Sequence, residues 1–234
     1  MFENQNLGSK PSLKQLVYEN LQNMIVQGKL EPGEKLIEDD LAQAMHISRA
    51  PIREAISMLE RDGFVRIIPR KGAIVAEVSE KDAMDIWKCR LALEPFAARE
   101  AMPHIPKEEL EAALKRIGKI EKDYSFEEYV ASDLEGHGLY YGHLDNEYMK
   151  SILNNLKAHS IRVRWLKEVR NSFTDMSRSS IREHRQIIEA FLSGDGDRVY
   201  TTVQQHILNS AARLKDPGDS IFCPPAPKTI EQKA

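Results

Sequence analysis

Two arginines four residues apart, Arg49 and Arg53, are the first side chains in this sequence with an evident capacity to read another molecule. Residues at this spacing share one face of a helix, so both guanidinium groups would project together. Arginine can donate two hydrogen bonds to guanine O6 and N7, or bind a phosphate. Ser48 is a residue type that favours the N-cap. The pattern therefore predicts a helix whose first turn contacts the major groove of DNA.

The positive charge of the chain is concentrated near these arginines. The net charge of −3 does not favour a nucleic-acid binder, but residues 49–71 hold six cations against three acids. Within this stretch Arg70, Lys71 and Gly72 form a basic turn. Such a turn can contact phosphates or reach the minor groove, and glycine lets the backbone approach closely. The competing interpretation is that these side chains only form a solvated surface.

Periodicity predicts the elements that position these side chains. Apolar residues at 3.6-residue spacing predict amphipathic helices, and the partly alternating stretch around a Pro-Arg-Lys-Gly turn predicts a β-hairpin. The expected elements are helices over 13–27, 37–44 and from 48 to about 62, and a hairpin over 64–78. This order is typical of a winged helix-turn-helix, and we assign it to a domain spanning residues 1–78.

The remainder of the chain predicts an antiparallel bundle of helices without strands. Ser79 opens a capping-box-like start. Pro95 is expected to interrupt and kink the first of these helices, and three glycines near residue 140 are expected to weaken the third. The expected helices span 79–102, 106–122, 126–143, 146–172, 181–193 and 197–214. We predict a helical domain over 79–215 and a disordered, proline-rich tail over 216–234.

Composition places the chain among ordinary soluble proteins. Hydrophobic residues make up 41% and charged residues 29%, and there is no apolar run long enough to cross a bilayer. No secretory leader is visible, so a cytoplasmic location is expected. Cys89 and Cys223 form no CxxC pair, which argues against a disulfide framework or a thiolate zinc site.

Residues 13–78 resemble the winged helix of the GntR family of transcription regulators. The resemblance is carried by Pro32-Gly33-Glu34, by Ser48 to Ala55, by Leu59-Glu60 with Gly63, and by Gly72. It implies that Ser48, Arg49 and Arg53 contact DNA, with Arg70, Lys71 and Gly72 at the wing. Asp39 stands where some relatives have an arginine that touches phosphate, so that contact is not expected here.

Residues 80–214 resemble the helical effector (FCD) domain of the FadR-type subfamily. The matching positions are Arg90 to Pro95, Asp133 with His137, Asn146, Glu183-His184 and His206-Ile207. The resemblance implies that one divalent metal is bound by Asp133, His137, His184 and His206.

Chemistry supports this ligand set independently. Asp133 and His137 lie four residues apart on one helix face, and His184 and His206 each have apolar neighbours that predict an inward orientation. Imidazoles with one carboxylate suit zinc, nickel, copper or iron(II), and we expect zinc or nickel. The competing interpretation of any one histidine is an ordinary core or surface residue.

A small anionic effector is expected beside this metal. Arg90 is the first candidate to bind a carboxylate, with Asn146 and Arg162 as weaker candidates. The alternative for Arg90 is a structural ion pair with Glu94. Open coordination sites also permit a metal-dependent hydrolase or isomerase, but such an enzyme would not need a winged helix. We therefore predict a non-enzymatic regulator that binds a palindromic operator as a homodimer.

Overall fold

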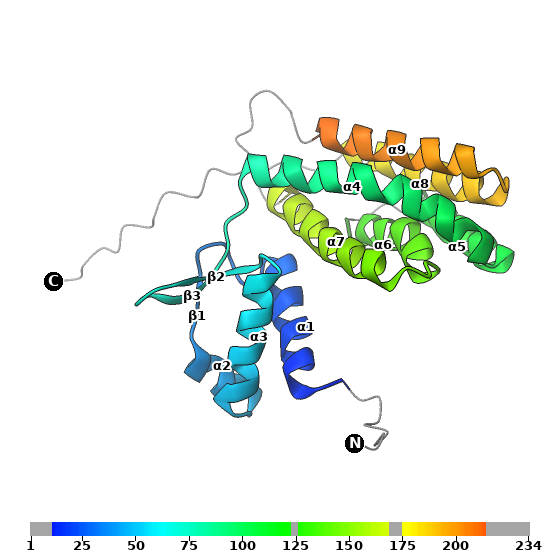
Figure 1. Cartoon of the computed structure of the whole chain (residues 1–234). Helices are drawn as coiled ribbons and strands as arrows, with labels where there is room; N and C mark the ends of the chain where they lie inside the picture. Colours follow the sequence, from blue (N-terminus) through cyan, green and yellow to red (C-terminus); the bar gives the residue numbers. More distant parts are fainter. Residues whose placement is uncertain (1–10, 123–125, 169–174, 214–234) are drawn as a thin grey trace, which may run out of the picture. The chain divides into compact units, whose positions relative to one another are not determined.

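The computed structural model describes residues 11–122, 126–168 and 175–213. These residues form two compact units that divide between Glu77 and Val78 (Figure 1). The segment 216–234, predicted above to be a disordered tail, lies outside the described residues, and so does Cys223. No helix in the described part of the chain combines the length and the apolar character needed to cross a membrane.

The first unit contains three helices and a small antiparallel sheet. Its sheet has the order β1-β3-β2, and β2 and β3 form the expected hairpin, in which Val65 pairs with Val75 and Ile68 with Gly72. The two-residue strand β1 was not predicted, because two residues show no alternation. The elements are α1 (Leu13–Val26), β1 (Lys35–Leu36), α2 (Glu38–Met45), α3 (Arg49–Arg61), β2 (Val65–Ile68) and β3 (Gly72–Val75).

Helix α3 is positioned by its apolar stripe. Its buried side chains recur at helical spacing and pack against α1, whose own apolar stripe is buried in the same core. Burial of each large aliphatic side chain contributes about 1.5–3 kcal/mol. His46 ends α2 in a left-handed conformation with φ 55°, which turns the chain into α3. The stripe consists of Ile52, Ala55, Ile56 and Leu59.

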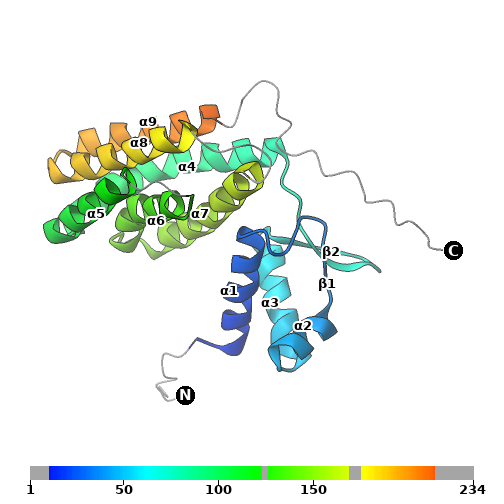
Figure 2. The ribbon, with the colours of Figure 1, turned by 180° about the vertical axis from the view of Figure 1, so that it is seen from behind.

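The second unit is a helical bundle, and no strand occurs in its described residues. Helix α4 begins at a complete capping box formed by Ser79 and Asp82, and it continues through Pro95. Helix α4 lies along α9, and α8 packs on α9, α6 and α5 (Figures 1 and 2). The helices are α4 (Glu80–Ala101), α5 (Lys107–Ile120), α6 (Phe126–Gly142), α7 (Glu147–Glu168), α8 (Asp175–Leu192) and α9 (Gly196–Arg213), with a 3-10 turn at Met102–His104.

These elements confirm the predicted fold class, a winged helix-turn-helix followed by an all-helical bundle. One boundary was wrong: α8 starts at Asp175, whereas the sequence predicted a start near 181. The Ser-Ile-Arg-Glu start signal at Ser180 therefore lies inside the helix. Serine followed by glutamate three residues later resembles a capping box, but the same spacing also fits the interior of an amphipathic helix.

Candidate metal centre and DNA-reading face

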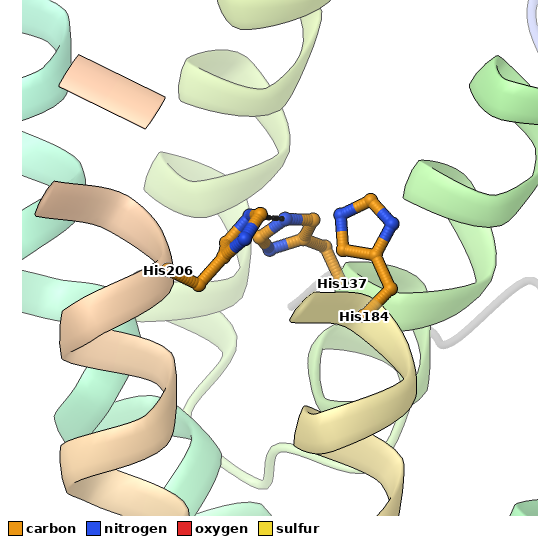
Figure 3. Close-up of side chains that lie close together, drawn as sticks. All are labelled: His137, His184 and His206. Atoms are coloured by element: carbon orange, nitrogen blue, oxygen red, sulfur yellow. Dashed lines mark hydrogen bonds between the residues drawn. The ribbon is translucent and has the colours of Figure 1, made fainter. Parts of the chain in front are cut away.

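Three helices of the second unit bring three histidines together. His137 comes from α6, His184 from α8 and His206 from α9, and all three are buried. One ring nitrogen of each lies within 4.8 Å of the corresponding atoms of the other two. Figure 3 shows the three rings gathered between the helices. This grouping joins residues up to 69 positions apart in the sequence.

The other ring nitrogen of each histidine, Nδ1, lies close to a polar side chain. His137 Nδ1 lies 2.9 Å from Glu94 Oε2 and 2.5 Å from the Tyr140 hydroxyl, which itself donates to Glu94. His206 Nδ1 lies 2.8 Å from Glu183 Oε2. His184 Nδ1 lies 3.2 Å from Ser132 Oγ. Metal-binding histidines commonly have such partners, which set the tautomer and the ring orientation.

These partners direct two nitrogen lone pairs toward each other. A carboxylate can only accept, so Glu94 and Glu183 assign the proton of each ring to Nδ1 of His137 and His206. The Nε2 atoms of these two rings are then both acceptors, and they lie 3.1 Å apart. Burial lowers the pKa of His206 to about 4 and that of His184 well below its usual value, so an additional proton is disfavoured. A cation between the rings would remove this repulsion.

Asp133 lies at the edge of the cluster. Its Oδ1 is 3.6 Å from His137 Nε2 and 3.5 Å from His184 Nε2. The same oxygen accepts a hydrogen bond from Arg164 of α7, a residue that the sequence analysis did not select. Burial alone would raise the pKa of Asp133, but Arg164 and the histidines hold it well below its usual range. The carboxylate is therefore ionised, as a metal ligand must be.

Gly136 allows the His184 ring to approach α6 directly. A Cβ atom at this position would lie 3.4 Å from both Cγ and Cδ2 of His184, which is tighter than most contacts of this kind. The helix is continuous through Gly136 and Gly138 despite the lower helix propensity of glycine. The glycine thus has a packing role that its sequence context did not reveal.

Arg90 is buried beside the cluster. Its Nε lies 2.5 Å from Glu94 Oε1, so the ion pair considered from the sequence is present. Its Nη2 lies 3.4 Å from His137 Nε2, the atom that faces the other histidines. Its Nη1 is buried and has no hydrogen-bond partner among the described residues. Although burial opposes it, the charge of Glu94 raises the pKa of Arg90, so the cation is permanent.

The two weaker effector candidates lie in different surroundings. Arg162 of α7 is buried, with 1% of its surface exposed. Asn146 is exposed at the start of α7, where its Oδ1 accepts the Met149 backbone N–H. About 16 residues of helix at 1.5 Å each separate it from Arg162. The structure does not bring Asn146 to the histidine cluster, and capping accounts for its side chain.

The predicted DNA-reading residues of α3 are exposed and lie at its first turns. Ser48 precedes the helix at the N-cap position, and its side chain makes no capping hydrogen bond. Arg49 is ion-paired with Asp39, and Arg53 binds Glu38 through Nε and Nη2, the latter at 2.8 Å. Both acids belong to the first turn of α2, and the sequence analysis did not anticipate these pairs.

The predicted wing residues form the tip of the hairpin. Arg70, Lys71 and Gly72 are all exposed where the chain turns from β2 into β3. Arg70 and Gly72 have positive φ angles of 66° and 87°. Glycine adopts such angles without strain, which explains its place at the first residue of β3. The tip therefore presents two cations on a tight turn.

Comparison with known proteins identifies both units. The gntR family of bacterial regulatory proteins matches residues 13–75, and the FCD domain matches residues 85–209. The gluconate operon transcriptional repressor of Bacillus subtilis is 29% identical over 222 residues, 89% of this chain and 87% of the relative. The HTH-type regulator YdhC of the same species, itself uncharacterized, is 28% identical over 204 residues, 85% of this chain and 89% of the relative.

A solved structure supports the same assignment at the level of the fold. McbR/YncC of E. coli superposes with a TM-score of 0.75 at 19% identity, over 88% of this chain and 98% of that one. The named relatives are transcription regulators, so the enzymatic alternative finds no support. This chain belongs to the GntR family of DNA-binding transcription regulators, in the FadR-type subfamily whose C-terminal unit is an FCD domain.

Proposed function

We propose that this regulator changes its affinity for an operator when a small carboxylate effector binds beside a divalent metal in the FCD domain. The proposal rests on the geometry of His137 and His206. Their Nε2 atoms face each other at 3.1 Å, and the Nδ1 atom of each ring interacts with a carboxylate. Buried acceptors that face each other cost free energy unless a donor or cation lies between them.

The donor set fits a divalent metal of the zinc or nickel type. His137, His184 and His206 would supply imidazole nitrogens, and Asp133 would supply a carboxylate oxygen with Arg164 as its outer partner. Four ligands leave further coordination positions for oxygen atoms of a small molecule. When bound, the metal would supply an electrophilic centre that attracts a carboxylate.

Arg90 is the side chain best placed to hold that carboxylate. Its Nη1 donor is buried without a partner among the described residues, and its Nη2 lies beside His137 Nε2. Arg162, buried on α7, is a second candidate. The relative that represses a gluconate operon is consistent with an acid as effector, since gluconate is a hydroxy acid.

The winged unit would bind the DNA. Ser48, Arg49 and Arg53 would contact the major groove, and the wing formed by Arg70, Lys71 and Gly72 would contact phosphates or the minor groove. One recognition helix reads only a few base pairs, so we propose a homodimer on a palindromic operator. We also propose residues 1–78 and 79–215 as the limits of the two domains.

The test uses the full chain, purified without chelators, and an operator selected from a random duplex library. We expect close to one equivalent of metal per chain, most of it lost in His184→Ala and His206→Ala. Arg49→Ala or Arg53→Ala should weaken operator binding by about 1–3 kcal/mol while metal content is unchanged. Chelation should abolish the response to carboxylates and preserve basal DNA binding. Unchanged DNA affinity in both arginine variants, or metal content independent of both histidines, would overturn the proposal.

A further inference from the structure

The carboxylates around the histidine cluster are already engaged. Glu94 interacts with Arg90, His137 and Tyr140, and Asp133 interacts with Arg164 and the histidines. Burial opposes ionisation of Glu94, yet the charge of Arg90 and the hydrogen bond from His137 hold its pKa well below the usual range. Neither carboxylate is left as the direct partner of a further cation.

A further cation is nevertheless present on α7. Lys157 is partly buried, and its Nζ lies 5.8 Å from the centroid of the Tyr141 ring. The Tyr141 ring is itself 6.4 Å from the His137 ring, so the ammonium group and the cluster lie beside the same tyrosine. Among the described residues, Lys157 forms no ion pair.

Helix α6 approaches Lys157 at a glycine, so no side chain of Gly138 covers the ammonium group. A Cβ atom at Gly138 would lie 3.7 Å from Lys157 Nζ, so any larger residue there would approach the ammonium group. Burial lowers the pKa of Lys157, while Asp133 and Glu94 act in the opposite direction from a distance. A partly buried ammonium group without a direct counter-ion is stabilised by an anion that contacts it.

We infer that Lys157 binds a second anionic group of the effector, which makes the preferred effector a small dicarboxylic acid. This inference rests on the proposed function, in which the first carboxylate lies at the metal and Arg90. The second carboxylate would lie at Lys157, next to Gly138 and the Tyr141 ring. Hydrogen bonds between ionised partners are stronger than neutral ones, so this contact would discriminate between diacids and monoacids.

Matched acid pairs test this directly. The full chain, with zinc added, is titrated calorimetrically with succinate against butyrate and with malate against 2-hydroxybutyrate, which differ by one carboxylate. The wild type should bind the better diacid on the order of 10- to 100-fold more tightly than its matched monoacid. Lys157→Met keeps the aliphatic stem and should bring this ratio close to one without weakening the monoacid. Lys157→Arg should retain most of the preference.

Lys150→Met is the matched control, because Lys150 lies on the same helix and pairs with Glu147. The Lys150→Met variant should keep the wild-type ratio of diacid to monoacid affinity. Thermal unfolding should show that all variants are folded. The inference would be overturned if the wild type bound monoacids as tightly as diacids. It would also be overturned if Lys157→Met kept the preference for diacids or lost affinity for both acids equally. These outcomes would leave the proposed function in place. If no acid of either kind binds, the proposed carboxylate effector fails as well.

Discussion

In each imidazole of the histidine cluster, the hydrogen-bond partner of Nδ1 determines whether Nε2 carries a proton or a lone pair. Glu94 and Glu183 hold the Nδ1 protons of His137 and His206, so the Nε2 lone pairs face inward. Glu183 is in turn held by Arg213 and Asn209 of α9. Burial would raise the pKa of Glu183, but Arg213 and His206 keep it below the usual range.

Replacing Glu183 by glutamine should weaken the proposed metal site. The amide keeps the shape but loses the negative charge that makes His206 a stronger donor to a metal, and such outer partners are typically worth about 10- to 100-fold in metal affinity. Competition with a chromophoric zinc chelator measures the change. Glu189→Gln, on the same helix, is the control, because Glu189 contacts Arg185 and not the cluster. Equal zinc affinity in both variants would show that Glu183 has only a structural role.

The buried histidines should make the metal-free protein sensitive to acid. In the unfolded chain His206 binds a proton near pH 6.5, whereas the folded protein keeps it neutral down to about pH 4. Between these values the unfolded state binds more protons, so the free energy of unfolding falls as the pH is lowered through this window. For His206 the loss reaches about 3 kcal/mol by pH 4, and His184 acts in the same direction.

Urea unfolding of chelator-treated protein between pH 7 and pH 4 measures this loss. Carboxylates also titrate near the acid end, so His206→Gln serves as the reference. The variant should show a shallower decrease of unfolding free energy between pH 6.5 and pH 4. Parallel pH profiles for the two proteins would rule out a contribution from His206.

At the scale of elements, α2 and α3 are joined by charge as well as by packing. The first turn of α2 carries Glu38 and Asp39, and each binds one of the two arginines at the start of α3. DNA phosphates would compete with these acids for the same guanidinium groups. The pairs are exposed, so each is weak and is screened by salt.

Glu38→Gln should therefore raise the affinity for duplex DNA of random sequence by up to about fivefold at low salt. In this variant Arg53 does not have to break an ion pair with a carboxylate before it binds a DNA phosphate. Fluorescence anisotropy of a labelled duplex measures the affinity. Glu54→Gln changes the net charge equally, and Glu54 pairs with Lys14 of α1, so it controls for the general effect of charge. If Glu38→Gln binds no better than Glu54→Gln, or binds worse, Glu38 orients Arg53 for DNA instead of competing with it.

At the scale of the whole molecule, the two units have separate cores. In the first unit α1 and α3 pack together, and in the second the apolar core is shared among α4 to α9. The histidine cluster lies within the second core, and the arginines lie on the surface of the first unit. The residues proposed to bind the metal and those proposed to contact DNA can therefore be changed independently.

Calorimetry of the full chain should show this independence as two unfolding transitions. Added zinc should raise the midpoint of only one of them, because a ligand stabilises the unit to which it binds. Ile52→Ala removes a fully buried side chain of α3 at a cost of about 2–5 kcal/mol, and it should lower the other midpoint while the zinc shift persists. A single transition, or two midpoints that always move together, would show that the units unfold as one.

The sequence by itself determined the features that depend on neighbouring residues. Helical periodicity, with the alternating pattern of the hairpin, was sufficient for the fold class, and the spacing of Arg49 and Arg53 placed them on one helix face. The spacing of Asp133 and His137 already implied their proximity, because residues four apart on a helix are neighbours. Family motifs added His184 and His206 as candidates, although neither lies near His137 in the sequence.

Only the tertiary structure decided how these side chains meet. The contacts from His137 to His206 and Glu94, from Asp133 to Arg164, and from Arg53 to Glu38 join different helices. They depend on the rotation and offset with which helices pack, which local periodicity does not specify. The same holds for Gly136, whose missing side chain matters only because His184 of another helix lies against it. A helical pattern predicts the inward face, and close packing selects the partners on it.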